Sequence, residues 1–238
     1  MFNAMAQAFM RREFELNIDT HYSIRSFLER FDAIFTLNQD TLLEYHYLHA
    51  VVGRGRWSAA RVPGIKPLNP GHQTGLPLDR VALMQPDEFD LNARIQPYFK
   101  LHGSSNWMSG PTGERLLVMG GNKAISINQF PILTRYHAEF QRLINVGGSR
   151  LMVIGYSFSD AHINKVIGEA IDANRLKLFI VDPQGVDVID KCKPTPIRIP
   201  DPYMEKLAPH IIGASRRSLV ETFASDVVEF DKLSRFFP

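Results

Sequence analysis

One stretch, residues 150–183, joins an apolar strand to an amphipathic helix and then to a second apolar strand. The first strand, Leu151 to Ile154, breaks at Gly155, and the second ends before Pro183. Between them, "AHINKVIGEAIDANR" has the apolar spacing of a helix that buries one face. Apolar strands that alternate with amphipathic helices are typical of a parallel sheet with helices on both faces. The stretch therefore predicts an α/β fold.

The rest of the chain continues this alternation, and we predict a single domain over residues 1–238. Gly, Pro and polar residues dominate residues 52–96, which we interpret as a loop-rich insertion or a small lid subdomain. The other expected helices cover residues 1–30, 41–50, 130–148 and 217–236, and the other expected strands cover residues 33–37, 97–103, 115–121 and, at a sheet edge, 195–200.

Composition limits the class of protein. Of 238 residues, 45% are apolar and 22% are charged, which is typical of a globular protein with its own core. The single cysteine, Cys192, excludes an internal disulfide framework and a cysteine-rich zinc site. The N-terminal sequence is unlike a signal peptide, and no apolar run approaches the ~20 residues of a membrane span. We therefore expect a soluble, cytoplasmic protein without a membrane partner.

Charge gives no indication of a nucleic-acid partner, because the formal net charge is only +2. Arginines do gather within residues 54–61 and at Arg216 and Arg217. We interpret both groups as solvated surface, as runs of charge usually are.

Polar or small residues follow four of the expected strands. These residues are Asn38, Asp40, His102, Gly155, Ser157 and Asp182. In open α/β sheets, ligands bind beyond the carboxyl ends of the strands. If the four strands are neighbours, the six residues are expected to converge on one crevice.

Each of these residues also has a purely structural interpretation. Asn38 and Asp40 could cap the following helix, where Thr41 and Glu44 have the spacing of a capping box. His102 could be an ordinary turn histidine. Gly155 could simply end a strand, Ser157 could start the next helix, and Asp182 before Pro183 is a common turn pair. His137 and His162 are interpreted as structural or exposed helix residues, and no histidines and carboxylates have convincing metal-ligand spacing.

Three motifs together resemble a known superfamily. "TLNQD" (36–40), "KLHGSSNW" (100–107) and "VIGYSFSDAHI" (153–163) occur in the order and context of the sirtuin-like superfamily. More narrowly, they resemble the bacterial sirtuin-like domains of NAD-consuming antiphage defence proteins, over roughly residues 30–185. The resemblance implies a Rossmann-like parallel sheet and a reaction that cleaves NAD, as substrate, to nicotinamide and ADP-ribose.

The resemblance also implies roles for single residues. His102 would be the catalytic base, and Asn38 would hold a water or the cofactor near the nicotinamide-bearing ribose. The residues that would bind the cofactor are Thr36, Asp40, Gly103, Gly155, Ser157 and Asp182, with Asp182 on the adenosine ribose. This chemistry suits the residue types, because cleavage passes through an oxocarbenium-like state and needs a placed nucleophile. Histidine titrates near neutral pH, and asparagine can orient water without adding charge.

The chain departs from the family pattern in two ways. Deacylase sirtuins carry four zinc-binding cysteines and this chain has one, so we expect no zinc and rank protein deacylation last. The family also opens with a strand and a Gly-rich loop that cradles pyrophosphate, whereas residues 1–32 contain no glycine. "MGGNK" (119–123) precedes no clear helix and "VGGSR" (146–150) precedes a strand, so neither replaces that loop.

We interpret the chain as a truncated reading frame or a piece of a longer protein. A non-catalytic module that binds nucleotides or drives oligomerisation is therefore the alternative function. The expected partners are NAD or ADP-ribose, and either a second copy of the chain or a neighbouring defence protein.

Overall fold

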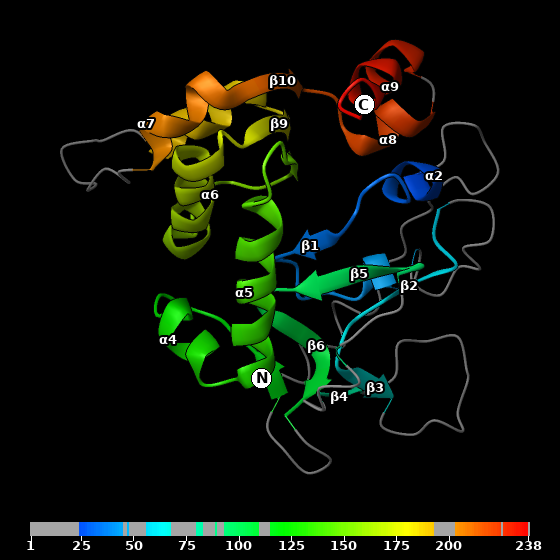
Figure 1. Ribbon diagram of the computed structural model, residues 1–238. Coiled ribbons are helices and arrows are strands. Elements are labelled where there is room, and N and C mark those ends of the chain that lie inside the picture. The colour runs from blue at the N-terminus through cyan, green and yellow to red at the C-terminus, as the bar shows by residue number, and fades with distance from the viewer. Residues whose placement is uncertain are drawn as a thin grey trace. The chain divides into compact units, whose positions relative to one another are not determined.

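The computed structural model describes residues 24–44, 47, 56–67, 80–82, 89, 93–109, 115–192, 203–224 and 226–237. The chain forms two compact units, Met1–His137 and Ala138–Pro238, which are described separately below (Figure 1). The helix expected before residue 24 and the edge strand expected at 195–200 lie outside the described residues. No helix among the described residues has the length and apolar character that a membrane crossing requires.

The first unit contains a parallel sheet in the order β1-β5-β2. Its strands are β1 (Ile34–Thr36), β5 (Ile95–Lys100) and β2 (Ala59–Arg61), and Figure 1 shows β1 and β5 side by side. Both pairings of β5 are parallel. The short helix α2 (Ile24–Leu28) buries three apolar side chains. Gln96 of β5 donates hydrogen bonds to the carbonyls of Leu28 and Phe31, at 2.9 and 2.7 Å, and so fixes the end of α2 to the sheet.

The same unit contains a mixed sheet in the order β3-β4-β6-β7. Its strands are β3 (Ile65–Pro67), β4 (Arg80–Ala82), β6 (Gly103–Met108) and β7 (Arg115–Leu117). The described parts of the loop-rich segment 52–96 thus contribute strands to both sheets. Sequence reasoning did not predict β6, because its residues Ser104, Ser105 and Asn106 are polar although all three are buried.

Aromatic side chains form the centre of the first unit. The ring of Phe99 stacks on Phe35 at 4.9 Å between centroids and meets the edge of Tyr136 at 5.1 Å. Trp107 of β6 also contacts Tyr136, at 6.1 Å. Tyr136 belongs to α5 (Pro131–Ile144), and its hydroxyl donates to the carbonyl of Pro63 at 2.5 Å. Burial raises the pKa of Tyr136 well above its usual value, so this hydroxyl remains a donor.

The glycine pair in "MGGNK" precedes a helix after all. Gly120 has a φ of 92° and starts a turn that leads into α4 (Lys123–Asn128). The expectation of no clear helix here was therefore wrong. The helix is only six residues long and is followed almost at once by α5, which explains its weak sequence signal.

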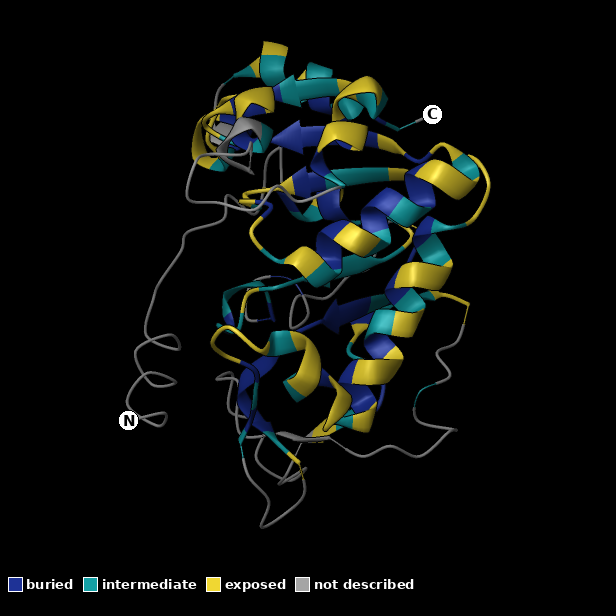
Figure 2. Cartoon of the chain, turned by 90° about the vertical axis from the view of Figure 1, so that its left-hand side faces the viewer, coloured by how far each residue is buried: buried dark blue, intermediate teal, exposed yellow. Residues whose placement is uncertain are grey.

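The second unit contains a parallel sheet in the order β10-β9-β8. The strands β8 (Arg150–Ile154) and β9 (Lys177–Val181) and the helix α6 (Ala161–Asn174) confirm the predicted strand–helix–strand stretch. Short helical segments follow at η2 (Gly185–Cys192), α7 (Met204–Leu207) and η3 (Ala208–His210). Figure 2 shows buried residues in dark blue on one side of the helices and exposed residues in yellow on the other. The α/β, Rossmann-like fold class predicted from the sequence is confirmed.

Strand β10 (Ile211–Ser215) pairs in parallel with β9 and was not predicted. Its sequence "IIGAS" contains a glycine, which weakens a strand signal. Gly213 is required by packing, since a Cβ there would lie 2.5 Å from the ring of Phe179.

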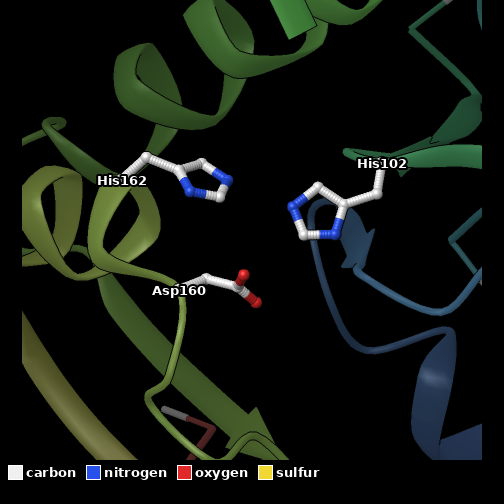
Figure 3. A group of neighbouring side chains, drawn as sticks. All are labelled: His102, Asp160 and His162. Atoms are coloured by element: carbon white, nitrogen blue, oxygen red, sulfur yellow. The ribbon is translucent and has the colours of Figure 1, made fainter. Parts of the chain in front are cut away.

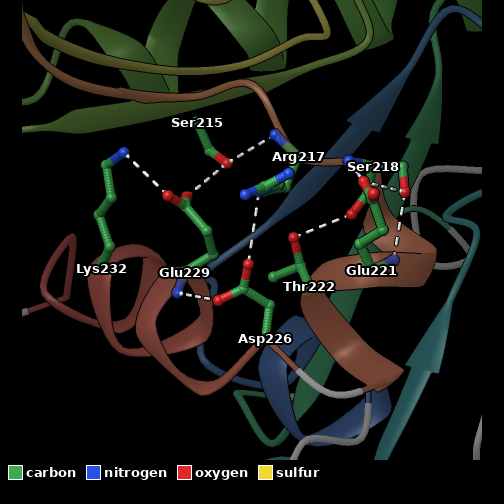
Figure 4. A network of polar contacts seen from close by, with 8 residues as sticks. All are labelled: Ser215, Arg217, Ser218, Glu221, Thr222, Asp226, Glu229 and Lys232. Carbon is green, nitrogen blue, oxygen red and sulfur yellow. Dashed lines mark hydrogen bonds and ion pairs between the residues drawn. The ribbon is translucent and has the colours of Figure 1, made fainter.

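The C-terminal segment forms two helices where the sequence predicted one, and that prediction was wrong. They are α8 (Leu219–Ala224) and α9 (Val227–Ser234). Asp226 starts α9, because its carboxylate accepts a hydrogen bond from the backbone N–H of Glu229 at 3.0 Å. Ser218 and Glu221 form a reciprocal capping box on α8, with both hydrogen bonds within 3.1 Å (Figure 4).

The capping box predicts a pH-dependent contribution to stability. Hydrogen bonds from the backbone and side chain of Ser218 lower the pKa of Glu221 from its ordinary 4.5. A carboxyl group whose pKa is lower in the folded than in the unfolded state stabilises the fold at pH values above its unfolded-state pKa. This stabilisation is lost as the pH falls through the folded-state pKa. Glu221→Gln is therefore expected to lower the urea unfolding midpoint, followed by circular dichroism, at pH 7 but progressively less below pH 4.5.

The control is the same substitution in a Ser218→Ala background, where the pH-dependent part of the difference should largely disappear. A difference between wild type and Glu221→Gln that stays constant from pH 7 to pH 3 would contradict the assignment.

Candidate functional site

The loop after β1 contains three of the predicted site residues. The hydroxyl of Thr36 accepts a hydrogen bond from the backbone N–H of Asn38 at 3.0 Å. The carboxylate of Asp40 accepts from the N–H of Leu42 at 3.0 Å and so caps the helical turn that begins there. Asn38 itself is exposed. The capping role considered for Asp40 is thus present, and it leaves the amide of Asn38 at the surface of this loop.

Gln39, which the sequence analysis did not single out, ties this loop to the next strand end. Its side-chain amide donates to the carbonyls of Val118 and His102, at 2.5 and 3.3 Å. Its own carbonyl accepts from the N–H of Ser105 at 2.8 Å. Its position between Asn38 and Asp40 was the one available signal, because a polar side chain at a strand exit needs partners.

A buried ion pair lies beneath the loop. The Lys100 ammonium lies 2.6 Å from a carboxylate oxygen of Glu44, and the two side chains are 0% and 6% exposed. The same ammonium donates to the backbone carbonyl of Asp40. The hydroxyl of Tyr98 donates to the second oxygen of Glu44 at 3.2 Å, and burial, followed by the charge of Glu44, raises the pKa of Tyr98. The Glu44 carboxylate is thus bound by Lys100 and Tyr98, in place of the capping box with Thr41 that the sequence spacing allowed.

His102 occupies the turn between β5 and β6 and is 2% exposed. Its ring lies 6.5 Å from that of His137, at an angle of 27°. Its carbonyl accepts from the N–H of Val118 at 3.0 Å. The next residue, Gly103, has a φ of 77°, and a Cβ there would lie 2.2 Å from the carbonyl oxygen of Leu116. The turn that presents His102 therefore requires glycine at position 103.

The ends of β1 and β5 are neighbours in this unit. The N–H of Leu101 donates to the carbonyl of Thr36 at 2.9 Å, which continues the parallel pairing beyond the last strand residues. The loop with Asn38 and the turn with His102 therefore leave the same edge of one sheet, as strand-end reasoning predicted for these two residues.

In the second unit, three strand ends are adjacent. The N–H of Gly155, directly after β8, donates to the carbonyl of Val181 at 2.9 Å. The N–H of Asp182, directly after β9, donates to the carbonyl of Ser215 at 3.0 Å. The carboxylate of Asp182 also accepts from the N–H of Gln184 at 2.9 Å, which is the turn role considered for it.

The loop from Gly155 to Asp160 is organised by a residue that sequence reasoning missed. The side-chain amide of Asn164, which is 1% exposed, donates to the carbonyl of Phe158 at 2.8 Å. Its oxygen accepts from the hydroxyl of Tyr156 at 2.9 Å. This support allows Phe158 to hold a φ of 53°, which non-glycine residues rarely adopt. The hydroxyls of Ser157 and Ser159 lie 2.9 Å apart within the loop.

Figure 3 shows the side chains of His102, which belongs to the first unit, and of Asp160 and His162, which belong to the second. His102 extends from the turn after β5, Asp160 directly precedes α6, and His162 is the second residue of that helix.

The predicted site residues are divided between the units. Those in Met1–His137 are Thr36, Asn38, Asp40, His102 and Gly103, and those in Ala138–Pro238 are Gly155, Ser157 and Asp182. Each set lies at the carboxyl ends of parallel strands. Their assignment to catalysis and cofactor binding stays a prediction.

The motifs at these strand ends have a counterpart among known families. A sequence model described as the SIR2-like domain matches residues 32–195, which is more than half of the chain. The protein belongs to the SIR2-like domain family. No curated protein matches the sequence significantly. The matched range begins before β1 and ends after η2, so β10, α8 and α9 lie beyond it.

The buried ion pair predicts a strong coupling between Lys100 and Glu44. Lys100→Met should destabilise the first unit by about 3–5 kcal/mol, because it leaves a carboxylate buried without its partner. The double variant with Glu44→Leu should cost less than Lys100→Met alone. Both tryptophans, Trp57 and Trp107, belong to the first unit, so denaturation followed by tryptophan fluorescence measures this change.

The control is Asp32→Asn in the same unit, since Asp32 is 76% exposed and forms a surface pair with Arg56. This substitution should cost less than about 1 kcal/mol. Additive losses at Lys100 and Glu44 would show that the two groups do not interact.

Substitution of Gly103 or Gly155 by alanine should lower the free energy of unfolding by different amounts. Gly103→Ala adds both an unfavourable φ and a Cβ 2.2 Å from the carbonyl oxygen of Leu116. Gly155→Ala adds only the unfavourable φ of 61°, because no atom lies within 4 Å of its Cβ position. The second change should cost about 1–2 kcal/mol, and the first should cost about 1–3 kcal/mol more. Equal losses in urea denaturation would contradict the close packing at Gly103.

Proposed function

We propose that this chain hydrolyses NAD to nicotinamide and ADP-ribose and that it acts in antiphage defence. The main observation in favour is that the Asn38 loop and the His102 turn leave adjacent ends of parallel strands within one sheet. Membership of the SIR2-like domain family supports a NAD-related role.

His102 is the proposed general base and Asn38 the proposed water-orienting residue. The C1′–N bond of the nicotinamide ribose breaks, and its electron pair leaves with the pyridine ring as neutral nicotinamide. A water oxygen forms the new bond to C1′, and the proton that it loses goes to the imidazole of His102. Asn38 would hold this water by hydrogen bonds, and its amide dipole adds no net charge to the site.

The proposed cofactor-binding residues would contact the dinucleotide, or position the residues that do, through backbone groups and short side chains. Thr36 and Asp40 fix the Asn38 loop by the hydrogen bonds that they accept. Gly155 has no side chain and no atom within 4 Å of its Cβ position, so a ligand could approach the backbone there. Gly103 would act by shaping the turn that presents His102. Ser157 would line the ribose and phosphate path, and Asp182 would accept from an adenosine ribose hydroxyl. Either a second copy of the chain or a neighbouring defence protein is the proposed partner.

The test is nicotinamide release from NAD by the purified protein, measured by chromatography. His102→Ala and Asn38→Ala should each reduce kcat by at least about a hundredfold, because each removes a group that acts in the transition state. The matched control is His210→Ala, a half-buried histidine of the second unit without a proposed role. Its activity should equal that of wild type.

Equal activity of wild type and His102→Ala would refute the catalytic assignment. Binding of ADP-ribose without any turnover of NAD would instead support a non-catalytic nucleotide-binding module. NAD-dependent deacylation of an acetylated peptide would overturn the low rank given to that activity.

A further inference from the structure

A pocket of about 490 Å³ lies within the second unit, beside the ends of β9 and β10. Its lining residues are Gly185, Val186, Ala214, Arg216, Arg217, Glu229 and Lys232. The volume falls in the range of small-molecule sites. Arg216 directly follows β10, and Gly185 follows β9 by four residues, so the pocket occupies the edge where α/β sheets bind ligands.

Three cations line this pocket, and each has a carboxylate partner. Arg216 pairs with Asp187 at 2.6 Å, Arg217 with Asp226 at 3.4 Å, and Lys232 with Glu229 at 3.3 Å (Figure 4 shows the last two pairs). The three cationic side chains are 64%, 56% and 44% exposed. Ion pairs with this exposure are worth little, so an anionic ligand can replace the carboxylates at small cost.

The carboxylate partners are held differently. Glu229 is 18% exposed and also accepts a hydrogen bond from Ser215 at 2.7 Å, so it is fixed in place. Asp187 is 59% exposed. The contact of Arg216 with Asp187 is thus the one that a ligand can most readily displace.

Gly185 leaves room for the side chain of Arg216 beside the pocket. It has a φ of 59°, and a Cβ there would lie 2.9 Å from Cγ and 3.0 Å from Nε of Arg216. The absence of that Cβ lets the arginine stem lie across the backbone at the start of η2. A larger residue at position 185 would therefore displace the stem of Arg216.

We propose that this pocket binds a phosphate on the 2′-oxygen of the adenosine ribose, so that NADP is preferred over NAD. The inference rests on the proposed function, which places the adenosine ribose of the substrate at Asp182. A phosphate on that ribose would then lie near the end of the adjoining strand β10. A phosphomonoester carries close to two negative charges near neutral pH and can accept bidentate hydrogen bonds from arginine. Arginine beside the ribose is the general means by which dinucleotide-binding folds accept a 2′-phosphate. Here Arg216 and Arg217 provide two such side chains at the end of β10.

The test compares two small probes that differ only by this phosphate, AMP and 2′,5′-ADP, by isothermal calorimetry on the full chain. Wild type should bind 2′,5′-ADP at least about tenfold more tightly than AMP. Arg216→Gln and Arg217→Gln should each abolish most of that preference and leave AMP affinity nearly unchanged. Arg216→Lys should retain part of it, since lysine keeps the charge but not the bidentate geometry.

The matched control is Arg142→Gln, which removes an exposed, paired arginine on α5 of the same unit. It should leave the preference intact. Equal affinity of wild type for the two probes, no binding of either, or a preference that survives both arginine substitutions would overturn the inference.

Turnover distinguishes this inference from the proposed function. Preference for 2′,5′-ADP without release of nicotinamide from NAD or NADP would refute the proposed hydrolysis and leave the phosphate site standing. Release from NAD and NADP with equal kcat/KM, together with equal binding of the two probes, would refute the phosphate site and leave hydrolysis standing.

Discussion

The arrangement of the first unit's strand ends depends on the buried contact between Lys100 and Glu44. Two charges removed from water contribute little net stability, and well-packed apolar side chains of similar size would serve at least as well. What apolar side chains cannot do is hydrogen-bond the backbone. The Lys100 ammonium reaches the carbonyl of Asp40, so a residue of β5 determines where the chain goes after β1. We infer that the pair specifies the position of the loop.

The two units fix their strand ends in the same way. In each, a backbone N–H just beyond one parallel strand donates to a carbonyl at the end of its neighbour, as from Leu101 to Thr36 and from Gly155 to Val181. A glycine at positive φ then turns the chain, at Gly103 in one unit and at Gly155 in the other. Regular pairing therefore extends up to the residue where the loop begins, and the loops start from rigid positions. Rigid support of this kind is what a binding or catalytic site requires.

The sequence predicted the parts of the fold in which local pattern and tertiary role agree. Strands β8 and β9 are continuous apolar runs and α6 has a clear apolar face, so their signals are unambiguous. Strand β6 was missed because Ser104, Ser105 and Asn106 are buried by their neighbours in the sheet, which no periodicity records. For the candidate site, strand-end position correctly predicted that Asn38 and His102 follow neighbouring strands at the same edge of one sheet. Strand-end position also applies to Gln39, but it could not reveal the backbone carbonyls that Gln39 and Asn164 hydrogen-bond, because only the fold brings those groups near.

Arg216 and Arg217 show that a charge pattern alone does not indicate whether the charged residues line a pocket. In sequence they are an ordinary surface pair, and their exposure in the structure agrees with that interpretation. In the structure the two arginines follow a parallel strand, line a pocket and pair with acidic residues. These features make an anion-binding role worth testing. Each carboxylate offsets a cation in the free protein, so a ligand with two negative charges gains more from displacing it than a ligand with one. A dianionic phosphate attracts the two guanidinium groups and a neutral ribose hydroxyl does not, so the charges of this pocket are consistent with the proposed preference for the phosphorylated ligand.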